Sequence, residues 1–96
     1  MQEQSAIQNA LDLVLGEFRR KGLVKSWSWD LGEDHEGEAA IFVYIVMRDP
    51  PRGNLKWADF KPIHDRVKQK LRDVVPARWP YVRVRLASEE RAAREY

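Results

Sequence analysis

Residues 39–47 read Ala-Ala-Ile-Phe-Val-Tyr-Ile-Val-Met, and this stretch is the only uninterrupted apolar run in the chain. It is dense in β-branched and aromatic residues, which is typical of a strand buried in the middle of a core. Because neighbouring side chains of a strand leave opposite faces, the run divides into two rows. One row is Ile41, Val43, Ile45 and Met47, and the other is Phe42, Tyr44 and Val46. Both rows are apolar, so we expect both faces of this strand to be covered.

The segments around this strand predict an α+β fold. Apolar residues recur at helical spacing over residues 5–21 and from about residue 57 to residue 75, which indicates two amphipathic helices. Alternating patterns predict further strands over residues 23–31 and 81–87, with a turn at 32–37 joining the first two strands. Residues 50–54, rich in proline and glycine, end the apolar strand. Ser88-Glu89-Glu90 opens a short C-terminal helix or tail.

The predicted order is therefore α-β-β-α-β, in one domain spanning residues 1–96. A chain this short cannot support two cores. We expect two helices on one face of a three-stranded mixed sheet, with a crossover helix between two parallel strands. Ser5 and Asp59 are the expected N-caps of the two helices, and Pro62 is expected in a first turn.

In the first strand, the expected helix-facing row contains both strand tryptophans. That row is Leu23, Lys25, Trp27, Trp29 and Leu31, and the opposite row is Val24, Ser26, Ser28 and Asp30. We expect all four tryptophans, Trp27, Trp29, Trp57 and Trp79, to serve packing rather than to form a ligand cage.

Composition limits the class of protein only broadly. The 96 residues include no cysteine, which excludes disulfides, thiolate metal sites and cysteine nucleophiles. No signal peptide or membrane-spanning stretch is evident, so we expect a cytoplasmic protein without a membrane partner. The net charge is only +2, but residues 30–38 hold five acids and no base, whereas residues 48–85 hold eleven Lys or Arg against four acids. The chain is thus electrically polarised.

The second row of the apolar strand is the strongest candidate for a functional surface. With the outward residues of the first and third strands it forms an apolar and aromatic centre with an arginine and carboxylate border, a composition expected of a protein–protein interface. The candidate partner-binding residues are Phe42, Tyr44, Val46, Tyr81, Arg83 and Arg85. We favour a homodimer or a protein partner on this face. Cover by the chain's own C-terminal tail and base stacking on nucleic acid are the alternatives.

Nucleic-acid binding by the basic second half is a separate alternative, because clustered Lys and Arg bind phosphates through counterion release. Its candidate residues are Lys68, Lys70, Arg72, Arg83 and Arg85. A solvated helix face explains the same pattern, since Asp65 and Asp73 interrupt it.

Catalysis and metal binding have weak signals. His35 lies among acids in the predicted turn, a solvated arrangement without the spacing of a calcium loop. His64 beside Asp65 is the only other histidine, and no nucleophile elbow, zinc motif or phosphate loop is present. We therefore expect a protein that is not an enzyme, with no cofactor and no small-molecule substrate. A metal-responsive module using His64 is a further alternative.

The element order, with residues 58–71 (Ala-Asp-Phe-Lys-Pro-Ile-His-Asp-Arg-Val-Lys-Gln-Lys-Leu), resembles the cytoplasmic domain of cation diffusion facilitator transporters. The resemblance covers roughly residues 5–87 and implies the same fold, dimerisation and a metal-binding histidine at His64. The family's other ligand positions hold different residues here, namely Ser28, Trp29, Asp30, Tyr44 and the sequence Leu86-Ala87-Ser88. The order is also similar to the type II KH fold, but no Gly-x-x-Gly loop is present.

Overall fold

Six elements follow one another along the chain in a computed structural model that describes residues 2–50 and 56–94. They are α1 (Gln2–Arg20), β1 (Val24–Glu33), β2 (Ala39–Met47), α2 (Trp57–Val74), β3 (Trp79–Leu86) and α3 (Ala87–Arg94). The predicted α+β class and the α-β-β-α-β order with a short C-terminal helix are confirmed. The predicted turn at 50–54 lies, from residue 51 onward, outside the described residues.

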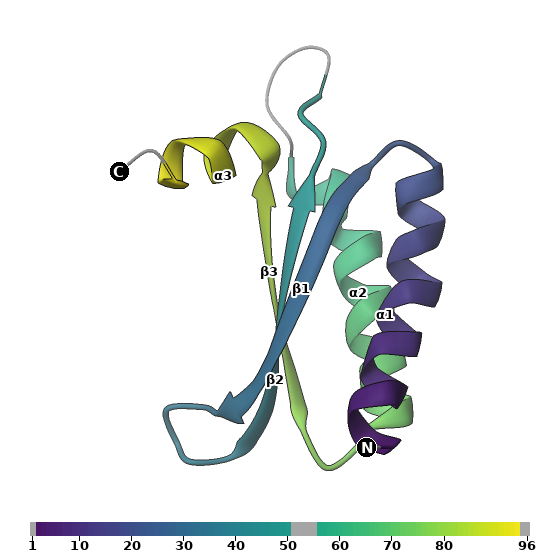
Figure 1. The fold of residues 1–96 in the computed structure, drawn as a ribbon, viewed down its shortest axis with the longest axis vertical. Coiled ribbons are helices and arrows are strands. Elements are labelled where there is room, and N and C mark those ends of the chain that lie inside the picture. The colour runs from purple at the N-terminus through teal and green to yellow at the C-terminus, as the bar shows by residue number, and fades with distance from the viewer. Residues whose placement is uncertain (1, 51–55, 95–96) are drawn as a thin grey trace.

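The strands form one mixed sheet in the order β1-β2-β3. β1 pairs antiparallel with β2, and β2 pairs parallel with β3. The hairpin turn is short enough for the antiparallel pair, whereas the parallel pair needs the α2 crossover. Figure 1 shows α1 and α2 side by side against one face of the sheet, and α3 leaving the end of β3 towards the other side.

The core lies between the sheet and the two long helices. The predicted inward row of β2, Ile41, Val43, Ile45 and Met47, is at most 2 % exposed. It packs against Ile7, Leu11, Val14, Leu15 and Phe18 of α1 and against Ile63, Val67 and Leu71 of α2. On the flanking strands, Trp27, Trp29, Leu31, Val82, Val84 and Leu86 are partly buried against this cluster. The predicted helix-facing rows are therefore confirmed over most of their length.

The start of β1 departs from the predicted alternation. Val24 is fully buried, whereas Leu23 and Lys25 are exposed. The β1–β2 register shifts between Val24 and Ser26. An irregularity of this kind inserts a residue and reverses the side-chain phase, so the predicted inward placement of Leu23 and Lys25 was wrong.

The helix ends also differ from the prediction. α1 begins at Gln2 and not after Ser5, and its Glu3 forms an ion pair with Arg78. The N-cap of α2 is Lys56, and Asp59 at the third helical position accepts a hydrogen bond from the Lys56 N–H at 2.9 Å. Pro62 is consequently the sixth residue of α2 rather than a first-turn residue.

The end of α1 is capped by a glycine. The N–H of Gly22 donates to the carbonyl of Arg19, and the N–H of Leu23 donates to that of Phe18, at 3.0 and 3.1 Å. This pair of bonds is a Schellman motif, and it places Gly22 at a φ of 80°, which glycine adopts without steric cost. Among the described helices, none is long and apolar enough to cross a membrane.

Two neighbouring residues of β2 test the two-sided description of the sheet. We expect Ile45→Ala to lower the free energy of unfolding by about 2–5 kcal/mol, because it opens a cavity in the core. We expect Tyr44→Ala, on the other face, to cost about 1 kcal/mol or less. Urea unfolding at low micromolar protein measures both. Equal losses would mean that the second face is as closely packed as the first.

Candidate functional site

The face of the sheet opposite α1 and α2 carries the outward rows of all three strands, and we call it the open face. Its residues are Ser26, Ser28 and Asp30 of β1, Phe42, Tyr44 and Val46 of β2, and Tyr81, Arg83 and Arg85 of β3. The strand register places Ser28, Tyr44 and Arg83 in one row across the sheet. The six residues predicted to bind a partner therefore lie on one surface.

The hairpin end of the open face is partly covered by the chain itself. The rings of Phe42 and Tyr81 are stacked, with centroids 5.6 Å apart and an angle of 19° between their planes. The ring of Phe42 also lies over Gly32, where a Cβ atom would come within 3.3 Å of it. Gly32 thus makes room for Phe42 to lie flat on the neighbouring strand.

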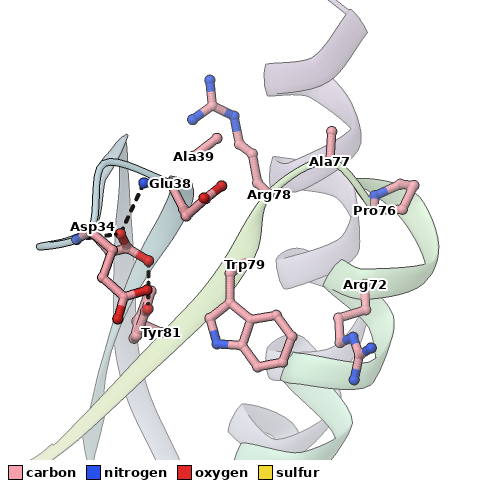
Figure 2. Close-up of a pocket in the computed structure, with 10 residues that line it drawn as sticks. Asp34, Glu38, Ala39, Arg72, Pro76, Ala77, Arg78, Trp79 and Tyr81 are labelled. Carbon is pink, nitrogen blue, oxygen red and sulfur yellow. Dashed lines mark hydrogen bonds between the residues drawn. The ribbon is translucent and has the colours of Figure 1, made fainter.

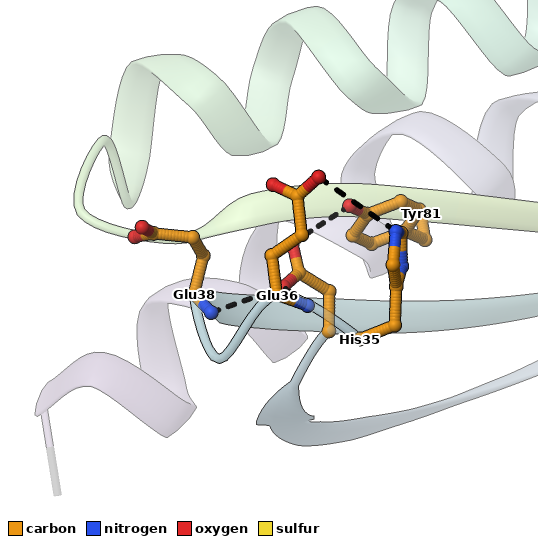
Figure 3. Close-up of polar contacts among 5 residues, drawn as sticks. His35, Glu36, Glu38 and Tyr81 are labelled. Atoms are coloured by element: carbon orange, nitrogen blue, oxygen red, sulfur yellow. Dashed lines mark hydrogen bonds and ion pairs between the residues drawn. The ribbon is translucent and has the colours of Figure 1, made fainter.

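Asp34 ties the hairpin turn to β3. Its carboxylate accepts hydrogen bonds from the N–H groups of Glu36 and Glu38, at 2.9 and 3.0 Å, and from the hydroxyl of Tyr81 at 2.9 Å. Figure 2 shows the contact between Asp34 and Tyr81. Figure 3 shows the exposed ion pair of the same turn, in which His35 Nε2 lies 3.8 Å from Glu36 Oε1. The predicted solvated turn around His35 is confirmed.

These hydrogen bonds shift two pKa values in opposite directions. The backbone N–H of Glu38 and the hydroxyl of Tyr81 hold the pKa of Asp34 below its ordinary 3.8. Ionised Asp34 therefore stabilises the fold above about that pH, and the contribution is lost as the pH falls through the lowered pKa. The same bond to Asp34 raises the pKa of Tyr81 above 10.0. The stability that this bond contributes is fully present below pH 10.0 and is lost as the pH rises through the raised pKa of Tyr81.

The centre of the open face is exposed. Tyr44 is 40 % exposed, although it lies between two fully buried neighbours in the middle strand. A pocket of about 300 Å³ surrounds it, lined by Ser28, Tyr44, Ile45, Val46, Arg83, Arg85 and Glu90. Arg85 lies 3.8 Å from Glu90 of α3 in a loose ion pair. Glu90 of α3 therefore borders this end of the face, and among the described residues Tyr44 stays partly exposed.

A second pocket, of about 480 Å³, lies beside the hairpin and the α2–β3 connection. Figure 2 shows its lining: Asp34, Glu38 and Tyr81 on one wall, Arg72 and Pro76 on the other, and Trp79 between them. Arg78 fastens this corner, because its guanidinium pairs with Glu3 and donates to the carbonyls of Gly32 and Ala40 at 3.4 and 3.2 Å. Sequence reasoning missed Arg78, since no local pattern marks a residue whose partners come from three other elements.

The tryptophans divide into two pairs. Trp27 and Trp29 pack against the core, as predicted. Trp57 and Trp79 are 51 % and 43 % exposed and pack at the edge of the fold instead of in the core, with the ring of Trp57 4.7 Å from that of Phe60. Trp79 instead lies beside the cations of Lys68 and Arg72, which are 5.3 and 4.9 Å from its ring centre.

The residues of the nucleic-acid alternative lie on two different surfaces. Arg83 and Arg85 belong to the open face, whereas Lys68, Lys70 and Arg72 belong to α2, which covers the opposite face of the sheet. Lys70 lines a separate groove with Asp73 and Arg66. One continuous basic surface is therefore not formed by these five residues.

The weak metal candidate, His64, contacts its neighbours on α2. Its Nδ1 lies 3.4 Å from an oxygen of Asp65, and its ring lies 5.2 Å from that of Trp57. Asp65 also pairs with Lys61, and this contact lowers its pKa. Over residues 2–50 and 56–94, no group of three or more His, Asp or Glu side chains is arranged to hold a metal ion.

Comparison of the chain with models of protein families, with curated proteins and with solved structures found no match. The resemblance to the transporter cytoplasmic domain therefore stays a prediction from the sequence.

The hydrogen bond between Tyr81 and Asp34 can be tested by removing one hydroxyl. We expect Tyr81→Phe to raise the pKa of Asp34 towards its ordinary value, so that acid unfolding starts at a higher pH. Titration of the Asp34 carboxyl carbon by NMR and acid unfolding followed by circular dichroism measure the two effects. Tyr44→Phe, the same chemical change on the same face, is the matched control and should leave both unchanged. Equal Asp34 pKa values in the two variants would contradict the assignment.

Proposed function

We propose that this chain is a non-enzymatic interaction module that docks on another protein surface through its open face. The observation that carries the proposal is the exposure of Tyr44, together with half-buried Phe42 and Val46, along the middle strand. The outer face of a sheet with one solvated side normally alternates to polar residues. Here the middle strand is apolar on both sides, and the two long helices, α1 and α2, cover only one of them.

The chemistry of the face defines the kind of partner. Its basic residues are both arginines, and its aromatic residues include two tyrosines. Tyrosine and arginine are enriched at protein interfaces, whereas lysine is depleted. We therefore propose a partner surface that is apolar at its centre and carries carboxylates opposite Arg83 and Arg85.

The size of the face limits the strength of docking. Three strands spaced about 4.8 Å apart, each rising about 3.3 Å per residue, present a footprint on the order of 400 Å² when β3, with eight residues, sets the length. A standard interface buries about 800 Å² per partner. We therefore expect micromolar or weaker docking unless α3 adds contacts.

As part of the proposal we place the protein in the cytoplasm, since a chain without cysteine suits a reducing compartment.

Site-specific photo-crosslinking tests docking on a partner whose identity is unknown. A benzophenone amino acid replaces Tyr44 in one variant and Leu13, which is 62 % exposed on α1, in the control. After irradiation in cells, we expect adducts of defined mass from position 44 and few from position 13. Adding Arg83→Asp should reduce the adducts from position 44. Equal adduct yields at the two positions would contradict the proposal. So would a yield at position 44 that Arg83→Asp does not reduce.

A further inference from the structure

We infer that the partner on the open face is a second copy of this chain, related to the first by a twofold axis parallel to β2. This inference rests on the proposed docking function and names the occupant of the same face. Its basis is the difference in side-chain size and charge between β1 and β3, the strands that form the two flanks of the face.

The β1 flank is small and acidic, and the β3 flank is large and basic. The outward residues of β1 are Ser26, Ser28 and Asp30, and those of β3 are Tyr81, Arg83 and Arg85. The serines, Asp30 and both arginines are exposed. A flank of small side chains leaves room above it, and a flank of long side chains projects, so each flank is shaped to receive the other.

Within the described parts of one chain, no ion pair joins the two flanks. They are separated by β2, which places them about 10 Å apart across the sheet. In the described parts of the chain, the side chains of Asp30 and Arg83 make no hydrogen bond or ion pair, and only their backbones are bonded within the sheet. Each charge is thus available to a partner.

A twofold axis parallel to the strands brings opposite flanks together. It places β1 of one subunit against β3 of the other, so Arg83 lies above the row that holds Ser28 and Asp30 of the partner subunit. Sheets packed face to face are about 10 Å apart, and an arginine side chain is long enough to reach an aspartate across that space. This contact between β3 of one subunit and β1 of the other forms twice, because a twofold interface is self-complementary.

The competing arrangements juxtapose like charges. An axis across the strands would place β3 on β3, with arginine facing arginine. Antiparallel pairing of two β3 edges would also bring the arginines of both subunits side by side on one face. Like charges directly opposite each other are destabilising. Around the parallel axis, Tyr44 meets Tyr44 of the partner subunit, and an aromatic pair of this kind is favourable at the centre of an interface.

Charge reversal tests this geometry. We expect the wild-type chain to dimerise in sedimentation velocity experiments at concentrations up to about 200 μM, in the weak range that its footprint allows. Asp30→Arg and Arg83→Asp should each weaken dimerisation at least tenfold, because each places two like pairs in the interface. A 1:1 mixture of the two variants should restore association, since the mixed dimer contains two opposite pairs.

Matched controls separate this effect from net charge and from misfolding. Asp73→Arg on α2 and Arg20→Asp on α1 make the same charge changes away from the open face, and they should leave dimerisation unchanged. Far-UV circular dichroism and thermal melts confirm that each variant is folded.

Each failure has a different meaning. A wild-type chain that stays monomeric at 200 μM would overturn the second copy as partner, while crosslinking at position 44 would still decide whether the face docks elsewhere. If neither charge reversal weakens dimerisation, or if the 1:1 mixture of the two variants does not associate, the twofold arrangement is overturned. Crosslinking that is equal at positions 44 and 13 would remove the docking function itself.

Discussion

The burial of one side of β2 is the constraint on which the rest of the structure depends. Its inward row is almost fully buried between α1 and α2. Because strand side chains alternate, this burial turns Phe42, Tyr44 and Val46 to the other face. A slip of one residue would exchange the two rows and place the Tyr44 hydroxyl in the core. The open face is therefore a consequence of how the core is built.

Features determined by local pattern could be predicted from the sequence, and features determined by distant contacts could not. A period of 3.6 residues identifies both long helices, alternation identifies the two outer strands, and an unbroken apolar run identifies the middle strand. The start of α1 was missed because Glu3 pairs with Arg78, 75 residues away. The burial of Val24 was missed because Leu23 and Val24 are both apolar. Only the irregular pairing opposite Met47 decides which of the two is buried.

The same distinction applies to the candidate site. Alternation alone places all six predicted residues on one face. It does not show that Phe42 lies over Gly32, or that Tyr81 binds Asp34, because both contacts require the strand order and the hairpin geometry. It also gives no sign that Trp79 stays exposed beside Lys68 and Arg72, since that depends on how α2 crosses the sheet.

The two ends of the open face differ in a way that favours docking. At the hairpin end, ring stacking and the Asp34 hydrogen bonds hold Phe42 and Tyr81 in place. Tyr44 sits on the central strand, whose backbone is paired on both sides. Binding is weakened when side chains and loops must be ordered on association. Because Phe42 and Tyr81 are already held, mainly the side chains of Tyr44 and the two arginines are left to be ordered on association. Such preorganisation is how a footprint this small can support specific association.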